Sequence, residues 1–234
     1  MRGHFLFDGR SSRDFGLIVS GEQTFNAPER DVETVEIPGR DGELTIGRGR
    51  FKPVTVSYPV FIRSGFRERA AAVRAWLMGA DGFRRLEDSY HPDEYRLARF
   101  AGPLDFTMRF LNYSGEASLA FTCQPQRWRK DGEFPLPCQN GGSLYNGGFP
   151  ARPLIKVSGT GAGTLSVGGV AVSLLSLDGY VMLDCDTQNA YQGTVNKNGT
   201  ISAPEFPVLQ PGENVVSWTG GVTSVEITPR WWTV

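Results

Sequence analysis

The sequence predicts a mainly β protein that carries one helix. Its 234 residues include 29 glycines and 15 prolines, a composition that favours frequent turns over long helices. Several segments alternate apolar and polar residues with period two, which is typical of strands with one buried face. Apolar residues recur convincingly at helical spacing in one segment, between residues 64 and 79. We therefore expect a chain built mostly of strands and turns.

The first predicted strands lie on either side of a projecting loop. The run V-E-T-V-E-I-P-G-R-D-G-E-L-T-I places two extended segments around P-G-R-D-G, whose proline and glycines favour a hairpin. A clear strand is expected over residues 54–62, where Val54, Tyr58 and Ile62 share one face and Ser57 lies on the other.

The helix is expected directly after this strand. Ser64 is the predicted N-cap and Gly79 the predicted end. Its apolar stripe, which we expect to face the core, consists of Phe66, Ala70, Val73 and Leu77.

A second hairpin is predicted after the helix. Apolar residues alternate on both sides of the turn N-Y-S-G-E, which leads us to expect that the two sets pair with each other. These residues are Phe106, Met108 and Phe110 before the turn and Leu119, Phe121 and Cys123 after it.

The second half of the chain differs in character from the first. Residues 1–130 contain 20 Lys/Arg and 17 Asp/Glu, whereas residues 131–234 contain 4 and 8. Residues 134–153 are rich in Gly, Pro and Asn without periodicity, so we expect a linker there. Beyond it, short apolar segments recur between Gly-rich turns, and this pattern predicts an all-β sandwich over residues 154–234.

The overall composition argues against several functional classes. The formal net charge of −1 provides no basic footprint for nucleic acid or for an anionic membrane surface. The N-terminal segment M-R-G-H-F-L-F-D-G-R has no apolar core typical of a signal peptide, so we expect synthesis in a cytoplasm. Cys123, Cys138 and Cys185 lack the spacing of a zinc site, and we expect neither a metal nor a cofactor.

Motifs for catalysis are weak. With two histidines, His4 and His91, a nucleophilic triad has few possible bases, and we interpret S-Y-H-P-D-E-Y around His91 as a turn. The glycines of V-S-G-T-G-A-G-T-L lack the Gly-Lys-Ser/Thr of a phosphate loop, so we interpret them as a flexible β-turn.

The segment L-D-C-D-T-Q-N-A-Y-Q-G is the best candidate for a ligand site. On a strand, Asp184 and Asp186 would point to one face at a separation of about 7 Å, within the range of a glycosidase pair. Together with Asn189 they could also contribute to a calcium site, although three donors are too few to specify one. No neighbouring group would raise a carboxyl pKa as a general acid requires, so we predict no catalytic residue. Asp184, Asp186, Tyr191 and Trp218 remain a possible ligand face.

The order of motifs along the whole chain resembles the distal tail protein (Dit) family of long-tailed siphophages. The most specific segments are E-I-P-G-R-D-G-E-L with the following helix, and F-P-V-L-Q-P-G-E-N. The segments R-R-L-E-D-S-Y-H-P-D-E-Y, F-T-C-Q-P-Q-R-W and V-E-I-T-P-R-W-W occur in the same order.

This resemblance implies a ring-forming hub of the tail tip. Residues 1–133 would form a β domain with one helix that assembles into a six-membered ring, 134–153 a linker, and 154–234 a galectin-like β-sandwich. The ring would join the tail tube protein to the tail-associated fibre or lysin protein around a channel for DNA, and receptor-binding proteins could attach at its periphery. The protein would then reside in the virion and would not be an enzyme.

The expected interface in such a ring includes the loop between the first predicted strands. A closed ring uses heterologous contacts, so each subunit needs two different complementary patches. We expect the interface residues to be Pro38, Gly39, Arg40, Asp41 and Gly42, with Arg48, Arg50 and Lys52 nearby.

Two alternatives from other functional classes are open at this point. A carbohydrate-binding module for the host wall would require exposed aromatic rings, such as Tyr191 or Trp218, on one sheet face. A glycoside hydrolase would be built on Asp184 and Asp186.

Overall fold

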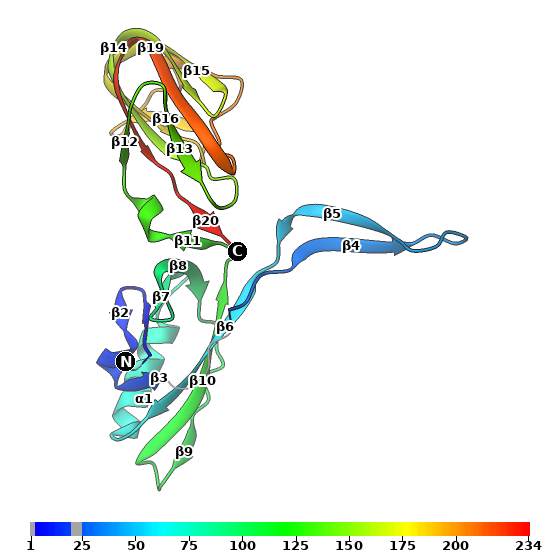
Figure 1. The fold of residues 1–234 in the computed structure, drawn as a ribbon. Coiled ribbons are helices and arrows are strands. Elements are labelled where there is room, and N and C mark those ends of the chain that lie inside the picture. Colours follow the sequence, from blue (N-terminus) through cyan, green and yellow to red (C-terminus); the bar gives the residue numbers. More distant parts are fainter. Residues whose placement is uncertain (1–2, 20–24) are drawn as a thin grey trace. The chain divides into compact units, whose positions relative to one another are not determined.

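The computed structural model describes residues 3–19 and 25–234 of the chain, and within them it is mainly β with one α-helix. The chain folds into two compact units. Unit 1 comprises Met1–Arg127 together with Val234, and unit 2 comprises Trp128–Thr233. Figure 1 shows the course of the chain through both.

Unit 1 is organised around one antiparallel sheet with the strand order β2-β1-β7-β8-β10-β6-β3, and β9 pairs with β10. The first half contains β1 (Phe5–Phe7), β2 (Arg10–Ser11), the short 3-10 helix η1 (Ser12–Phe15), β3 (Leu17–Val19), β4 (Arg30–Glu36), β5 (Glu43–Phe51) and β6 (Val54–Ile62). The second half contains α1 (Phe66–Met78), β7 (Arg84–Asp88), β8 (His91–Arg99), β9 (Thr107–Arg109) and β10 (Ser114–Cys123).

The core of unit 1 lies between the sheet and α1 and is dominated by aromatic rings. Trp76 of α1 stacks on Phe15 with ring centroids 4.2 Å apart, and its indole nitrogen donates to the carbonyl oxygen of Phe7 at 3.2 Å. The ring of Phe5 stacks on Tyr58 at 4.8 Å. The predicted inward face of α1 is confirmed, because Phe66, Ala70, Val73 and Leu77 are all buried.

The start of α1 differs from the prediction. The N-cap is Gly65, whose φ of 64° lies in the left-handed region, and no side chain caps the first turn. The expectation that Ser64 caps the helix is therefore wrong. The backbone turn at Gly65 replaces the side-chain cap.

The predicted second hairpin forms with a different register. Met108 of β9 lies opposite Gly115 of β10. The turn therefore spans residues 110–113, whereas the predicted turn N-Y-S-G-E spans residues 112–116. Phe110 lies in that turn with a φ of 53° and is 81% exposed. The predicted pairing of Phe106, Met108 and Phe110 with Leu119, Phe121 and Cys123 is wrong. Strand β10 instead pairs along most of its length with β6, which the local pattern could not reveal.

Unit 2 contains an antiparallel sheet with the strand order β12-β19-β14-β15-β16-β17, and β13 and β18 pair with β19 and β15. Its first elements are β11 (Arg127–Arg129), which begins at the unit boundary, the 3-10 helix η2 (Lys130–Glu133), β12 (Leu136–Cys138), β13 (Gly142–Asn146), β14 (Leu154–Val167) and β15 (Val170–Asp184). The remaining elements are β16 (Asn189–Gln192), β17 (Val195–Asn196), the 3-10 helix η3 (Asn198–Thr200), β18 (Ile201–Ser202), β19 (Gly212–Thr228) and β20 (Trp232–Thr233).

The segment expected to be a linker carries strands of unit 2. β12 pairs with the C-terminal part of β19, where Leu136 lies opposite Ile227, and β13 pairs with its N-terminal part. Residues 134–153 therefore differ from a linker, and the unit boundary falls between Arg127 and Trp128 instead of near residue 133. Their glycines and prolines flank short edge strands, which have too few residues for a period-two pattern to appear.

Glycines bend the long strands of unit 2 without ending them. The ladders that join β14 to β15 and to β19 shift register near Gly159 and Gly163, and Figure 1 shows these strands curling. A Cβ on Gly221 of β19 would collide with the carbonyl oxygen of Thr160 in β14, so only glycine fits at this position. The segment V-S-G-T-G-A-G-T-L is thus a bulge inside β14 and not the flexible turn that we predicted.

Candidate functional site

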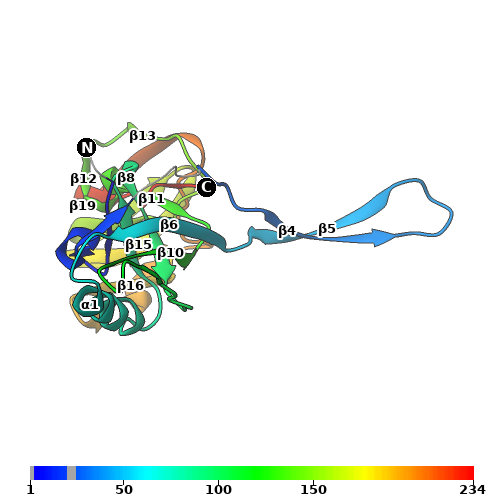
Figure 2. The same ribbon diagram turned by 90° about the horizontal axis from the view of Figure 1, so that it is seen from below.

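The best candidate for an interaction site is the β4–β5 hairpin of unit 1. It forms a two-stranded sheet of its own that extends away from the rest of unit 1 (Figures 1 and 2). Every residue of β4 and β5 is exposed except Asp31 and Phe51, which are half-buried. An isolated two-stranded hairpin is at best marginally stable in water. This ribbon therefore has little stabilisation from the rest of its own chain.

Three ion pairs connect the two strands near the base of the hairpin. Arg50 Nε lies 2.6 Å from Asp31 Oδ2, Arg48 Nη2 lies 3.2 Å from Glu33 Oε2, and Lys52 Nζ lies 3.3 Å from Glu29 Oε2. The hydrogen bond from Arg50 lowers the pKa of Asp31. Exposed pairs of this kind contribute only about 0–1 kcal/mol each.

The outer half of the hairpin has one apolar and one polar face. Val35 lies opposite Leu44, and Glu33 lies opposite Ile46, so these side chains share a face. The apolar residues of that face, continued into the turn, are Val35, Ile37, Leu44 and Ile46, with exposed fractions of 39%, 38%, 41% and 48%. The other face carries Thr34 opposite Thr45. This exposed apolar face makes the ribbon the candidate for a protein interaction.

The predicted interface loop forms the tip of this hairpin. Pro38, Gly39, Arg40, Asp41 and Gly42 are all exposed, and the Arg40 amide donates to the carbonyl oxygen of Ile37 at 3.1 Å. Gly39 and Gly42 have φ values of 81° and 80°, which explains the two glycines of the motif. The cationic groups of Arg48, Arg50 and Lys52 point to acids within the ribbon. Their role at an interface stays a prediction.

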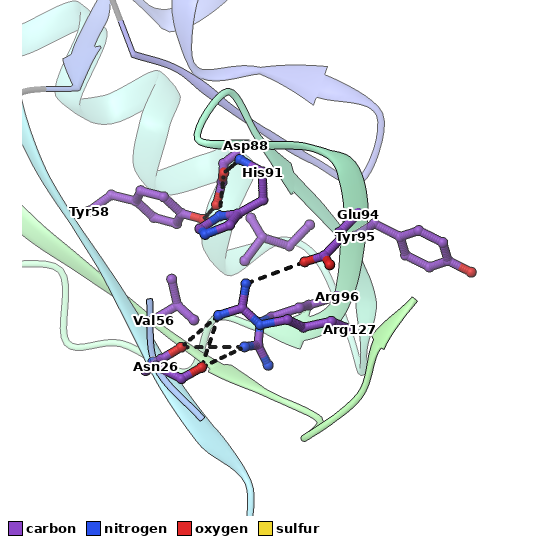
Figure 3. Close-up of a pocket in the computed structure, with 10 residues that line it drawn as sticks. Asn26, Val56, Tyr58, Asp88, His91, Glu94, Tyr95, Arg96 and Arg127 are labelled. Atoms are coloured by element: carbon purple, nitrogen blue, oxygen red, sulfur yellow. Dashed lines mark hydrogen bonds and ion pairs between the residues drawn. The ribbon is translucent and has the colours of Figure 1, made fainter. Parts of the chain in front are cut away.

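Two buried arginines fix the base of the hairpin, and sequence reasoning missed them. Arg127 donates to the carbonyl oxygen of Asn26 at 2.9 Å, and Arg96 donates to the side-chain oxygen of Asn26 at 3.3 Å (Figure 3). Arg127 also lies 3.4 Å from Glu94 Oε2 and stacks on Phe25. Burial, followed by repulsion from Arg127, lowers the pKa of Arg96. Hydrogen bonds to charged groups are worth about 1.5–3 kcal/mol, so this clamp holds the chain where it enters the ribbon.

A polar chain next to this clamp involves the histidine that we interpreted as part of a turn. Tyr58 donates to Asp88 at 2.7 Å (Figure 3). Asp88 also accepts from the backbone amides of Tyr90 and His91. The His91 ring nitrogen Nδ1 lies 3.0 Å from the same carboxylate. Burial raises the pKa of Tyr58, and the Asp88 charge raises it further. Asp88 therefore organises the β7–β8 turn, and this arrangement supplies no nucleophile.

The predicted ligand face of unit 2 is only partly assembled. Asp184 and Tyr191 share a face, because they lie on adjacent strands opposite Asn189 and Met182 respectively. Trp218 lies opposite Leu165, beyond the glycine bend, and packs against the core. The structure thus separates Trp218 from the other three residues of the predicted face.

The geometry around Asp184 favours a structural role. Its carboxylate lies 2.7 Å from Arg230 Nη1 and accepts from the Asp186 amide at 3.1 Å. Burial raises its pKa, but the hydrogen bonds from Arg230 and from backbone amides outweigh burial and leave the pKa lowered. A general acid needs the opposite shift. Asp186 is exposed and lies 3.6 Å from Arg152.

The cysteine thiols, the last candidate groups for chemistry, are buried and unreactive. Burial raises the pKa of Cys123 and Cys185 to about 12, so their thiols are not nucleophilic at neutral pH. Cys185 lies at the end of an alternating buried series with Val181 and Leu183. Among residues 3–19 and 25–234, no three His, Cys, Asp or Glu side chains are grouped to hold a metal. No helix in the same two ranges is long and apolar enough to cross a membrane.

Comparison with known proteins gives one strong result, at the level of the fold. No protein-family model and no curated protein sequence matches the chain. Among solved structures, the Dit protein of phage SPP1, a paradigm of the hub adsorption apparatus in phages that infect Gram-positive bacteria, is similar with a TM-score of 0.79. The match covers 100% of both chains at 13% sequence identity. This chain therefore shares the complete fold of the SPP1 Dit protein.

Proposed function

We propose that this chain is a structural, non-enzymatic component of the tail tip of a long-tailed bacteriophage. The observation that supports this proposal most is the likeness of fold to the SPP1 Dit protein, which extends over the full length of both chains. In this proposal the protein resides in the virion and acts as a hub to which other tail proteins attach.

The hub assembles as a ring of identical copies, with six as the expected number. Closed rings are built from heterologous contacts between two different patches of each subunit. The exposed apolar face of the β4–β5 hairpin supports this assembly, because its side chains are accessible to a neighbouring copy. The hairpin tip, with Arg40 and Asp41, lies at a contact with a neighbouring copy or with the tail tube.

The ring joins the tail tube protein to the tail-associated fibre or lysin protein and surrounds a channel through which DNA passes. Unit 2, which corresponds to the galectin-like domain that we expect, holds peripheral baseplate or receptor-binding proteins. Its independent core supports this separation of tasks, since the buried residues of a second hydrophobic cluster all lie within residues 151–231.

The test of this function is the mass of the purified full-length protein, measured by native mass spectrometry and light scattering, with ring images from electron microscopy. We expect six copies per particle, and Arg40→Glu should shift the particles toward smaller species. Lys197→Glu, a charge reversal in unit 2, serves as the control. A protein that stays monomeric at all concentrations, alone and with a tail tube protein, would contradict the proposal.

A second candidate function is direct carbohydrate binding by unit 2, supported by the shared sheet face of Asp184 and the half-buried Tyr191. Exposed aromatic rings beside acceptor groups are typical of sugar sites. Binding of the full chain to a glycan array, lost in Tyr191→Ala, would favour this function. An array without hits would remove it.

A further inference from the structure

Three Asn-Gly dipeptides occur in the chain, and all of them lie in unit 2. They are Asn140-Gly141, Asn146-Gly147 and Asn198-Gly199. An asparagine before glycine is prone to spontaneous deamidation, because glycine has no side chain that keeps its backbone nitrogen away from the asparagine. The glycine nitrogen attacks the side-chain carbonyl carbon, Cγ, the bond from Cγ to Nδ2 breaks, and ammonia leaves with the proton of the glycine amide. Water then opens the resulting succinimide ring to aspartate or isoaspartate.

The side-chain amide of Asn146 is held at both of its polar atoms. Its Nδ2 donates to the carbonyl oxygens of Phe149 and Leu209 at 2.8 and 2.9 Å, and its Oδ1 accepts from the Gly148 amide at 2.9 Å. The residue is only 1% exposed. Rotating its Cγ toward the Gly147 nitrogen would break these hydrogen bonds and leave buried polar groups unpaired, which is costly. The fold therefore protects Asn146.

Asn140 is exposed, but the fold restrains both of its reacting groups. Its Nδ2 donates to the carbonyl oxygen of Trp218 and its Oδ1 accepts from the Trp218 amide, both at 2.9 Å. The nucleophile is occupied as well, because the Gly141 amide donates to the carbonyl oxygen of Val216 at 2.9 Å. Reaction at Asn140 thus requires the turn to separate from β19 by local opening.

Asn198 is exposed and lies in the single turn of the 3-10 helix η3. Its Oδ1 accepts from the Ala190 amide at 2.6 Å, and its Nδ2 donates to the exposed side chain of Asn189 at 3.2 Å. In the parts of the chain that the structure describes, the Gly199 amide has no hydrogen-bond acceptor. Short 3-10 turns have poor hydrogen-bond geometry and open locally. Gly199 therefore supplies the nucleophile that the fold restrains least.

We propose that Asn198 is the asparagine at which the folded protein deamidates first, ahead of Asn140 and Asn146. The structure also indicates what the reaction changes. Replacing the amide by a carboxylate removes the donor to Asn189 and adds a negative charge next to β16. Isoaspartate also lengthens the main chain by one methylene group and moves the acceptor away from the buried Ala190 amide. Deamidation therefore loosens β16 on its side of the sheet.

Ageing of the purified full-length protein at mildly alkaline pH tests the order of the three sites. Peptide mapping by mass spectrometry measures, at each asparagine, the fraction in which an amide has become a carboxyl group. We expect Asn198 to react at least about fivefold faster than either of the other two, the ratio that one additional hydrogen bond gives. Equal or faster reaction at Asn140 or Asn146 would overturn the proposal, and so would an aged chain in which none of the three changes.

Ageing in concentrated urea separates the effect of the fold from that of the local sequence. The unfolded chain restrains none of the three asparagines, so their rates should become similar. If Asn198 stays ahead by the same factor in urea, its rate reflects its sequence neighbours, and the structural explanation is wrong.

Two glycine substitutions provide a matched pair of variants. Gly199→Ala should suppress the product at Asn198, because a methyl group hinders the attack, and its Cβ would meet no atom within 4 Å. Gly147→Ala would make only an ordinary contact with Tyr145 and should leave the total deamidation unchanged. Circular dichroism checks that both variants are folded. Equal losses of product in the two variants would contradict the assignment to Asn198.

Hydrogen exchange measures the consequence for β16. Exchange at the Ala190 amide should become faster in the aged wild-type protein and should not change in aged Gly199→Ala. Faster exchange in both proteins would mean that ageing loosens β16 by another route.

Discussion

The β4–β5 and β14–β15 hairpins both alternate apolar and polar residues, but their apolar residues differ in burial. In β14–β15, alternate residues such as Ile155, Val157 and Leu183 are completely buried in the core of unit 2. In β4–β5, Val35 and Leu44 are 39% and 41% exposed. Period-two alternation therefore specifies which side of a strand is apolar, but it does not specify what covers that side.

The two hairpins also differ in what holds them together. The long strands of unit 2 share a core, and they approach each other so closely at glycines that no side chain fits there. The β4–β5 hairpin depends on its ladder, on exposed ion pairs and on the arginine clamp at Asn26. Because exposed ion pairs contribute little, the hairpin is held less firmly than the long strands of unit 2.

The largest expected effect concerns Gly221, where β19 approaches β14 most closely. Gly221→Val would force a side chain against the carbonyl oxygen of Thr160 in the adjacent strand, and the backbone cannot yield without losing the ladder. We expect unit 2 to lose about 4 kcal/mol or more of unfolding free energy, measured by urea denaturation. Gly47→Ala in β5 meets no atom within 4 Å and should change stability little. Equal losses of unfolding free energy for the two substitutions would contradict the conclusion that the strands of unit 2 are packed more tightly than those of the β4–β5 hairpin.

A smaller effect is expected from removing a matched leucine in each region. Leu165→Ala deletes a fully buried side chain and should cost about 2–5 kcal/mol in the urea transition of unit 2. Leu44→Ala deletes an exposed one, so the unfolding free energy of the isolated chain should change by less than about 0.5 kcal/mol. Leu44→Ala should nevertheless weaken self-association. If it lowers the stability of the monomer as much as Leu165→Ala does, the hairpin is covered within its own chain.

The smallest expected effect is a difference in acid sensitivity. Asp184 and Asp31 both have lowered pKa values, so their stabilising contributions are present above the unfolded value of about 3.9 and are lost as pH falls through the folded value. Asp184→Asn should cost about 1 kcal/mol at pH 7, and this cost should fade below about pH 4. Asp31 is half-buried, but its partner Arg50 is exposed, so water and salt screen the ion pair and Asp31→Asn should change the unfolding free energy little. Chemical denaturation at pH 7 and at lower pH values measures both effects. A cost of Asp184→Asn that does not change with pH would contradict the conclusion that the ionised carboxylate of Asp184 stabilises the fold.

Features encoded by local residue chemistry were predictable from the sequence. The two glycines of P-G-R-D-G indicated the turn that Gly39 and Gly42 form with positive φ. The alternation in residues 54–62 correctly placed Val54, Tyr58 and Ile62 on a buried face. The apolar stripe of the helix was equally clear, because its spacing depends on neighbours three or four residues apart.

Features that depend on distant residues could not be predicted in this way. The clamp brings Asn26 together with Arg96, 70 residues away, and with Arg127, 101 residues away. No local pattern distinguishes these two arginines from the others. The bulges in β14 were also hidden, since a glycine that ends a strand and one that bends it have the same sequence signature.

The open edges of the β4–β5 ribbon have a consequence for the protein before assembly. Both strands present unpaired backbone groups along one side, and such edges can recruit further strands into fibres. Charged side chains along the ribbon, including Glu36 beside Glu43, repel a second ribbon laid against the first. These acidic groups thus protect the free chain from polymerising in the wrong geometry, and neutralising them should increase the light scattering of stored protein.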